Sequence, residues 1–183
     1  MRRLALFLVC CFALPAVHNA AAQPAAWKTR LAESMPLLGH RNWILIVDSA
    51  YPLQSSPGVE TVETSASLLD VVHAVLDTIN HSIHVRPNIF MDAELPFVSD
   101  QDAPGVSAYR TRIASLLHPY TIQSLPHEQI ISRIDQAGKT FHILVLKTNM
   151  TIPYTSVFIQ LNCRYWSDDA ESRLRAKMKA AGK

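Results

Sequence analysis

Short apolar runs and stretches with helical spacing alternate along this chain. The clearest run is Trp43 to Val47, an uninterrupted set of apolar residues rich in β-formers, which is typical of a strand buried on both faces of an α/β sheet. Asp48 follows it directly, at the carboxyl end of the predicted strand. Open parallel sheets bind ligands outside the carboxyl ends of their strands, so Asp48 is a candidate site residue, although it can also simply cap the next loop.

Further segments continue this alternation. Apolar or alternating residues predict strands or extended segments at 59–64, 85–91, 120–125, 141–146 and 154–161. Helical spacing predicts helices at 27–38, 68–79, 109–117, 126–138 and from Ser167 onward. The second of these carries Ser67 and Asp70 as a capping box. Because strands and helices alternate, we expect a single α/β domain with helices on both faces of a mostly parallel sheet.

The first residues have the layout of a secretory signal peptide. Arg2 and Arg3 precede an apolar run over 4–17, and small residues lead to Ala22. The run is shorter than the ~20 residues that span a bilayer, which disfavours a permanent membrane anchor. We therefore expect cleavage after Ala22, a signal peptide at 1–22, a mature domain at 23–183 and export to the periplasm or the exterior.

Composition bounds the class of protein. The 183 residues are 49% hydrophobic and 17% charged, with a net charge of +2, which fits one globular domain and argues against nucleic acid as a partner. Cleavage would leave Cys163 as the single cysteine, so an internal disulfide is impossible. The core or subunit association must then stabilise the exported protein.

Two features raise the possibility of a metal site. The segment 92–105 carries Asp92, Glu94, Asp100 and Asp102 but lacks the spacing of a calcium loop, so a solvated loop is the preferred interpretation. His81 and His84 are the only close histidine pair and fall at a predicted helix end. A metal-binding protein is therefore the least favoured interpretation of this sequence, and we expect no metal.

Polar residues at the ends of predicted elements are the remaining candidates for chemistry. The sequence has no nucleophile elbow, phosphate-binding glycine loop, dinucleotide fingerprint or zinc spacing. The candidates are His40, Asp48, His127, Tyr154 and Ser156. Such a set suits hydrogen bonding to a polyol and proton transfer without a cofactor, with histidine as the natural acid or base. The alternative is that any one of the eight histidines lies on the surface or in the core.

Three separated patches resemble the D-ribose pyranase and L-fucose mutarotase family. They are LGH at 38–40 with the strand that ends in VDSAYP at Pro52, PHEQI at 126–130, and PY at 153–154 before an apolar strand. The resemblance runs from about Met35 to Leu161. It implies a three-layer α/β/α fold, rings or decamers with sites near subunit boundaries, and action on free ribose-like or fucose-like sugars without a cofactor.

The resemblance also implies a role for each candidate. His40 would be the catalytic acid or base, and Asp48, His127 and Tyr154 would line the sugar site. Ser156 stands where the family has an asparagine, and Ile131 where ribose pyranases tend to have a lysine. These departures concern the substrate more than the chemistry.

The spacing of His40 and Asp48 favours a site shared between subunits. Eight residues across a strand can extend up to roughly 26 Å at ~3.3 Å per residue, which one sugar ring cannot bridge. We therefore expect a homo-oligomer in which His40 of one subunit meets Asp48, His127 and Tyr154 of its neighbour. The predicted function is a cofactor-free sugar isomerase, and the alternative is a noncatalytic sugar-binding or transport-associated protein with the same fold.

Overall fold

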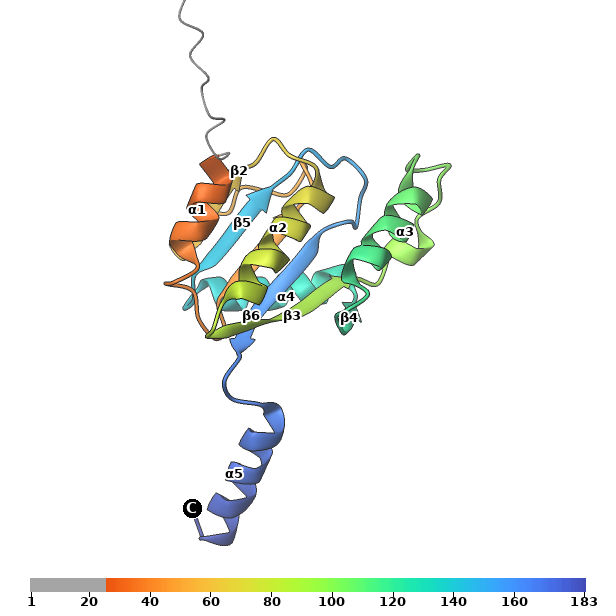
Figure 1. Ribbon diagram of the computed structural model, residues 1–183. Helices are drawn as coiled ribbons and strands as arrows, with labels where there is room; N and C mark the ends of the chain where they lie inside the picture. The colour runs from red at the N-terminus through yellow and green to blue at the C-terminus, as the bar shows by residue number, and fades with distance from the viewer. Residues whose placement is uncertain (1–25) are drawn as a thin grey trace, which may run out of the picture.

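Six strands form one mixed sheet at the centre of the protein (Figure 1). The computed structural model describes residues 26–183, so the predicted signal peptide lies outside the described residues. The strands are β1 (Trp43–Val47), β2 (Val59–Glu63), β3 (Val85–Asp92), β4 (Ile122–Leu125), β5 (Ile143–Lys147) and β6 (Val157–Cys163), in the order β2-β5-β1-β6-β3-β4. β6 pairs antiparallel with β1 and β3, and the other pairings are parallel. The expected mostly parallel sheet is thus confirmed.

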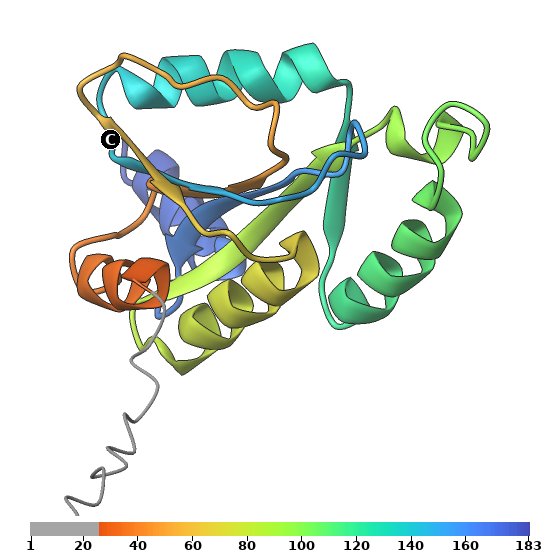
Figure 2. The same ribbon diagram turned by 90° about the horizontal axis from the view of Figure 1, so that it is seen from above.

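Helices cover both faces of this sheet and make a three-layer arrangement. The covering helices are α1 (Ala26–Ser34), α2 (Leu68–His81), α3 (Val106–Leu117) and α4 (His127–Gly138). A 3-10 turn, η1 (Leu95–Phe97), and a helix outside the layers, α5 (Asp168–Ala180), complete the described chain. Figure 2 shows α4 on one face and α1, α2 and α3 on the other. None of the helices in the described part of the chain is long and apolar enough to cross a membrane.

The position of strand β1 between two layers of helices explains why its sequence is apolar without interruption. Ile44 and Ile46 pack into the core under α1, α2 and α3, whereas Trp43, Leu45 and Val47 pack into the core under α4. Side chains of a strand point alternately to the two faces, and here both faces are covered. All five residues are buried, and they deliver Asp48 to the carboxyl edge of the sheet.

Two local features of the sequence have the structural roles that their residue types favour. Ser67 Oγ accepts a hydrogen bond from Asp70 N at 3.3 Å and donates one to the Asp70 carboxylate at 2.6 Å, which confirms the capping box of α2. Pro87 lies inside β3, where β6 pairs with it and β4 pairs only from Ile89 onward. The missing N–H of Pro87 therefore removes no bond to β4.

Some predicted boundaries were wrong. Helix α1 ends at Ser34, several residues before the expected end at Leu38, and Pro126 is the N-cap residue of α4 instead of its first residue. The larger error concerns the predicted solvated loop at 92–105. Asp92 is the last residue of β3 and is 2% exposed, because α4 and the end of the sheet enclose it.

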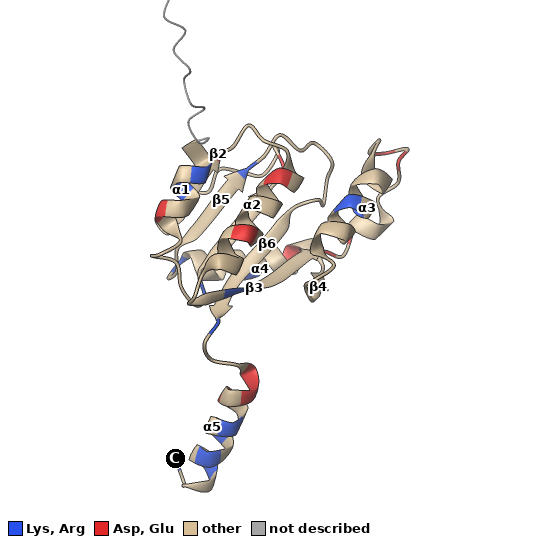
Figure 3. Ribbon diagram, in the orientation of Figure 1, with Lys and Arg blue, Asp and Glu red and all other residues tan. Residues whose placement is uncertain are grey.

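Helix α5 projects away from the body of the protein (Figure 1). None of its residues is buried. A single ion pair joins it to β3, with Arg86 Nη2 3.0 Å from Asp168 Oδ1. Acidic residues occupy its first turn and Lys177 and Lys179 its last turn, as the helix dipole favours (Figure 3).

Candidate functional site

A cavity of about 560 Å³ lies at the carboxyl end of β1; we call it the Asp48 cavity. Three segments line it: the loop after β1, the first turns of α4, and residues 151–154 before β6. These segments are far apart in the sequence and meet because β1 and α4 approach the same edge of the sheet. The structure thereby brings Asp48, His127 and Tyr154 together in one cavity, as the sequence predicted.

Backbone and side-chain donors fix the Asp48 carboxylate. One oxygen, Oδ1, accepts from Ala50 N at 2.8 Å, and the other, Oδ2, accepts from Ser156 Oγ at 3.2 Å. Ser156 is 2% exposed and is absent from the cavity lining, so its contact within this chain is to Asp48. The arrangement leaves a half-buried carboxylate with a defined orientation at the cavity wall.

His127 opens α4 and pairs with the buried Asp92. Its Nδ1 lies 3.1 Å from Asp92 Oδ1, and its backbone N–H donates to the Glu94 carboxylate at 3.0 Å and 3.1 Å. These contacts hold both the backbone and the imidazole ring of His127 in place. With Nδ1–H donating to Asp92, the neutral ring presents Nε2 as a proton acceptor.

The environment of Asp92 controls its charge. Burial raises the pKa of its carboxyl to about 6, and the hydrogen bond with His127 opposes this rise. Within residues 26–183, Asp92 Oδ2 has no hydrogen-bond partner. Near neutral pH the Asp92 carboxylate is therefore mostly charged, and it lies 3.1 Å from His127 Nδ1.

Two tyrosines complete the lining of the Asp48 cavity. Tyr154 packs edge-to-face against His127, with ring centroids 5.7 Å apart, and its backbone is left-handed at φ 59°. A bulky residue in this conformation is strained, and such strain clusters at functional sites. Burial raises the pKa of Tyr51 to about 12, so its hydroxyl stays protonated and can donate a hydrogen bond.

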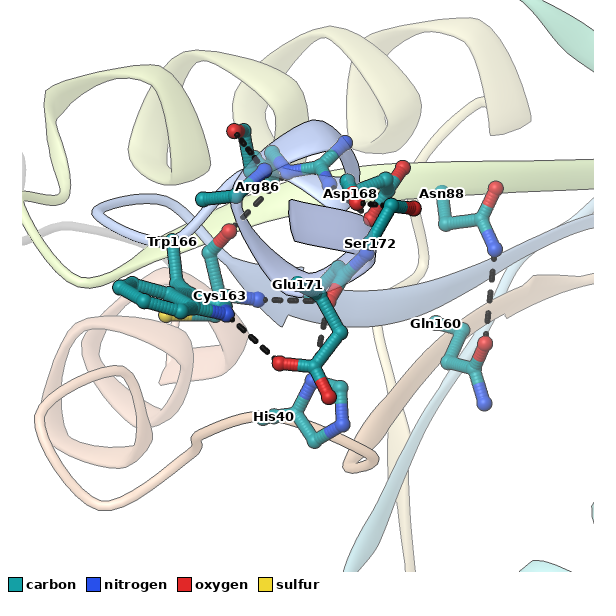
Figure 4. Close-up of polar contacts among 12 residues, drawn as sticks. His40, Arg86, Asn88, Gln160, Cys163, Trp166, Asp168, Glu171 and Ser172 are labelled. Carbon is teal, nitrogen blue, oxygen red and sulfur yellow. Dashed lines mark hydrogen bonds and ion pairs between the residues drawn. The ribbon is translucent and has the colours of Figure 1, made fainter. Parts of the chain in front are cut away.

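His40 lies at the other end of β1, in a different cavity. Its Nδ1 is 2.9 Å from Asn162 Oδ1 on β6, and its ring is exposed beside the first turn of α5, where Trp166 Nε1 donates to Glu171 (Figure 4). His40 and Asp48 therefore flank a buried strand, and a single chain does not unite the five predicted residues around one cavity.

Asp92 is the site residue that sequence reasoning missed. The sequence pattern predicts a solvated loop for it, because the four carboxylates of the segment lack the spacing of a calcium loop. The signal that could have found it is the one that found Asp48, an aspartate directly after the apolar end of a strand. No cluster of three or more potential metal ligands occurs in the described part of the chain.

Comparisons with known proteins agree with this fold. A model of the RbsD / FucU transport protein family matches residues 24–164. The structure of Bacillus subtilis RbsD complexed with D-ribose is similar, with 18% identity, a TM-score of 0.52 and coverage of 72% of this chain and 90% of that chain. FucU from Bifidobacterium longum gives 16% identity, a TM-score of 0.51, and coverage of 72% and 92%. No curated protein matches the chain.

Proposed function

Because the chain belongs to the RbsD / FucU transport protein family, we propose that it is an isomerase of free monosaccharides that needs no cofactor. The reaction is opening of the hemiacetal ring and its closure as the other anomer or the other ring size. The observation that carries the proposal is the Asp48 cavity, where an oriented carboxylate, a histidine paired with a buried carboxylate and a tyrosine surround a space of about 560 Å³.

Ring opening requires two coordinated proton transfers. A base takes the proton of the anomeric hydroxyl, the electron pair forms the carbonyl, the bond from the anomeric carbon to the ring oxygen breaks, and an acid protonates that oxygen. The reverse steps on the other carbonyl face, or with another hydroxyl as nucleophile, give the product. Each positioned group contributes typically ~10²–10⁴-fold to the rate.

Two histidines are suited to these transfers. In the proposal His40 is the principal proton carrier. His127, whose Nε2 is free and whose Nδ1 contacts Asp92, acts as the acid when His40 acts as the base, and as the base when His40 acts as the acid. Asp48 accepts hydrogen bonds from sugar hydroxyls and holds the ring near the histidines. Tyr154 provides an aromatic wall for the sugar.

The site in this proposal is composite, because His40 and Asp48 lie at opposite ends of β1. The five residues of β1 alone extend about 16 Å at ~3.3 Å per residue. His40 of one subunit would therefore complete the Asp48 cavity of the next, in a homo-oligomer with repeated head-to-tail contacts. The predicted signal peptide adds the proposal that this assembly works in the periplasm or outside the cell.

Exchange NMR on free ribose, fucose, galactose and glucose tests the activity. We expect the wild-type protein to accelerate the interconversion of one of these sugars and His40→Ala to abolish the acceleration. His73→Ala is the matched control, since His73 is an exposed residue of α2 outside the cavity. Sugar binding without any acceleration, equal in wild type and His40→Ala, would instead favour the noncatalytic sugar-binding protein.

A mixing experiment tests the composite site. His40→Ala and Asp48→Ala each remove one half, and random co-assembly restores both halves in about a quarter of the sites. We expect two inactive variants to regain exchange activity after they are unfolded and refolded together. A mixture that stays inactive, or a monomer with full activity, would contradict the shared site.

A further inference from the structure

A second cavity of about 560 Å³ lies at the amino end of β1, beside His40; we call it the arginine cavity. It lies between α4 and the sheet, and its lining includes Arg41, Arg133, Gln136, Gln160 and Asn162. This lining contains no aspartate or glutamate from the residues that the structure describes. Two acidic side chains on adjoining elements, Asp135 of α4 and Glu171 of α5, line neighbouring cavities.

Aromatic rings hold both guanidinium groups of the arginine cavity. The Arg41 guanidinium carbon lies 5.8 Å from the centroid of the Phe141 ring, and that of Arg133 lies 5.5 Å from the centroid of the Phe90 ring. Within residues 26–183, neither group has a hydrogen bond or an ion pair, whereas Arg30 pairs with a carboxylate. Stacking limits the motion of a guanidinium and leaves its edge free to donate.

The amide side chains of the cavity add to the excess of donors. The oxygen of each is occupied: Gln136 accepts from Lys139 at 3.1 Å, Gln160 accepts from Asn88 at 3.4 Å (Figure 4), and Asn162 Oδ1 contacts His40. None of the three amide nitrogens donates to another residue of the described chain. The cavity therefore presents N–H groups from arginines and amides, and its amide acceptors are already bonded.

We propose that the arginine cavity binds an oxyanion, either a carboxylate or a phosphate group. Guanidinium groups pair with both anions through charge-assisted hydrogen bonds, and unpaired amide N–H groups can bond the remaining oxygens. The ligand is a free anion or the acidic group of a sugar. Residues of one chain line this cavity, and His40, which the proposed isomerase uses in the site of the neighbouring subunit, is one of them. The variants below leave His40 unchanged, and the inference does not require isomerase activity.

Calorimetric titration of the intact protein at low salt tests this inference. The ligands are inorganic phosphate, glucuronate and glucose, and the variants are Arg41→Gln and Arg133→Gln. We expect each variant to bind the oxyanion roughly 10-fold or more weakly, because each removes one charge-assisted contact. Arg112→Gln is the matched control, since Arg112 is an exposed arginine of α3 outside the cavity, and it should bind like wild type.

The choice among ligands identifies the source of the anion. Binding of glucuronate without binding of phosphate or glucose assigns a sugar acid, and binding of phosphate assigns a phosphate group or free phosphate. Arg41 and Arg133 are exposed, so both variants should melt like wild type. Absence of any oxyanion binding, or binding that Arg112→Gln weakens as much as Arg133→Gln, would overturn the inference. Since binding is measured without turnover, the result is separate from the fate of the proposed isomerase.

Discussion

The two ends of β1 carry different kinds of site. At the carboxyl end, the carboxylates of Asp48 and Asp92 are fixed by hydrogen bonds and partly or fully removed from water. At the amino end, His40 and Arg41 are exposed, and the cations there lack acidic partners in the described chain. The first end is organised within one chain, whereas the second offers groups to something outside it.

The largest expected difference between the two ends is in catalysis. His127→Gln keeps a polar side chain but removes the imidazole ring that Asp92 orients. We expect a ~10²–10⁴-fold loss of sugar exchange, the usual contribution of a positioned acid or base. Exchange NMR on the accepted sugar measures it.

His73→Gln is the control for this prediction, because it changes an exposed histidine of α2. Full activity in His127→Gln, together with loss in His40→Ala, would mean that only the amino end of β1 moves protons.

The second prediction concerns the pH dependence of stability at the carboxyl end. The pKa of Asp92 is raised from 3.8 to about 6, so the folded state holds this proton more tightly than the unfolded chain. Stability from this group is therefore full below about pH 4 and declines as pH rises to about 6, by about 3 kcal/mol in total. Asp92→Asn should lose this decline. Denaturant unfolding from pH 4 to 8 measures it.

Asp169→Asn is the control here, since Asp169 is an exposed residue of α5. It should follow the wild-type pH profile. A profile for Asp92→Asn that parallels wild type would show that the buried carboxyl does not titrate in this range.

The third prediction concerns backbone strain at Tyr154. Its φ of 59° is a conformation that asparagine tolerates and β-branched residues do not. Tyr154→Asn and Tyr154→Val both remove the ring, so the loss of the ring contacts is common to the two variants. We expect the valine variant to be less stable by about 1–2 kcal/mol in denaturant unfolding. Equal stabilities would mean that the segment relaxes when the ring is lost.

The smallest expected effect is at the end of the chain. Removal of residues 165–183 deletes α5, none of whose residues is buried, and the exposed ion pair between Arg86 and Asp168. Surface changes of this kind shift stability by about 0.5 kcal/mol or less, and we expect that from denaturant unfolding. A larger loss would indicate that α5 packs on a neighbouring subunit.

Local patterns in the sequence were enough for most of the fold. The apolar run of β1, the capping box of α2 and the proline before α4 each depend on residues close together in the chain. The same patterns predict Asp48, His127 and Tyr154 as site residues, because the sequence places each at the end of a predicted element and the family resemblance adds their order. The end of α1 is predicted too late from Gly39 as the stop, whereas Pro36, two residues after Ser34, is the local signal that fits the observed end.

The sequence by itself determined which residues reach the edges of the sheet, since strand and helix periodicity are local properties. Only the tertiary structure decided what each of them meets there. Asp92 looked like one of several loop carboxylates, and burial beside His127 made it a titrating partner. Arg41 and Arg133 are far apart in sequence, and a cavity between α4 and the sheet unites them. Burial, pKa and shared cavities depend on contacts between distant segments, which the pattern of a single segment does not contain.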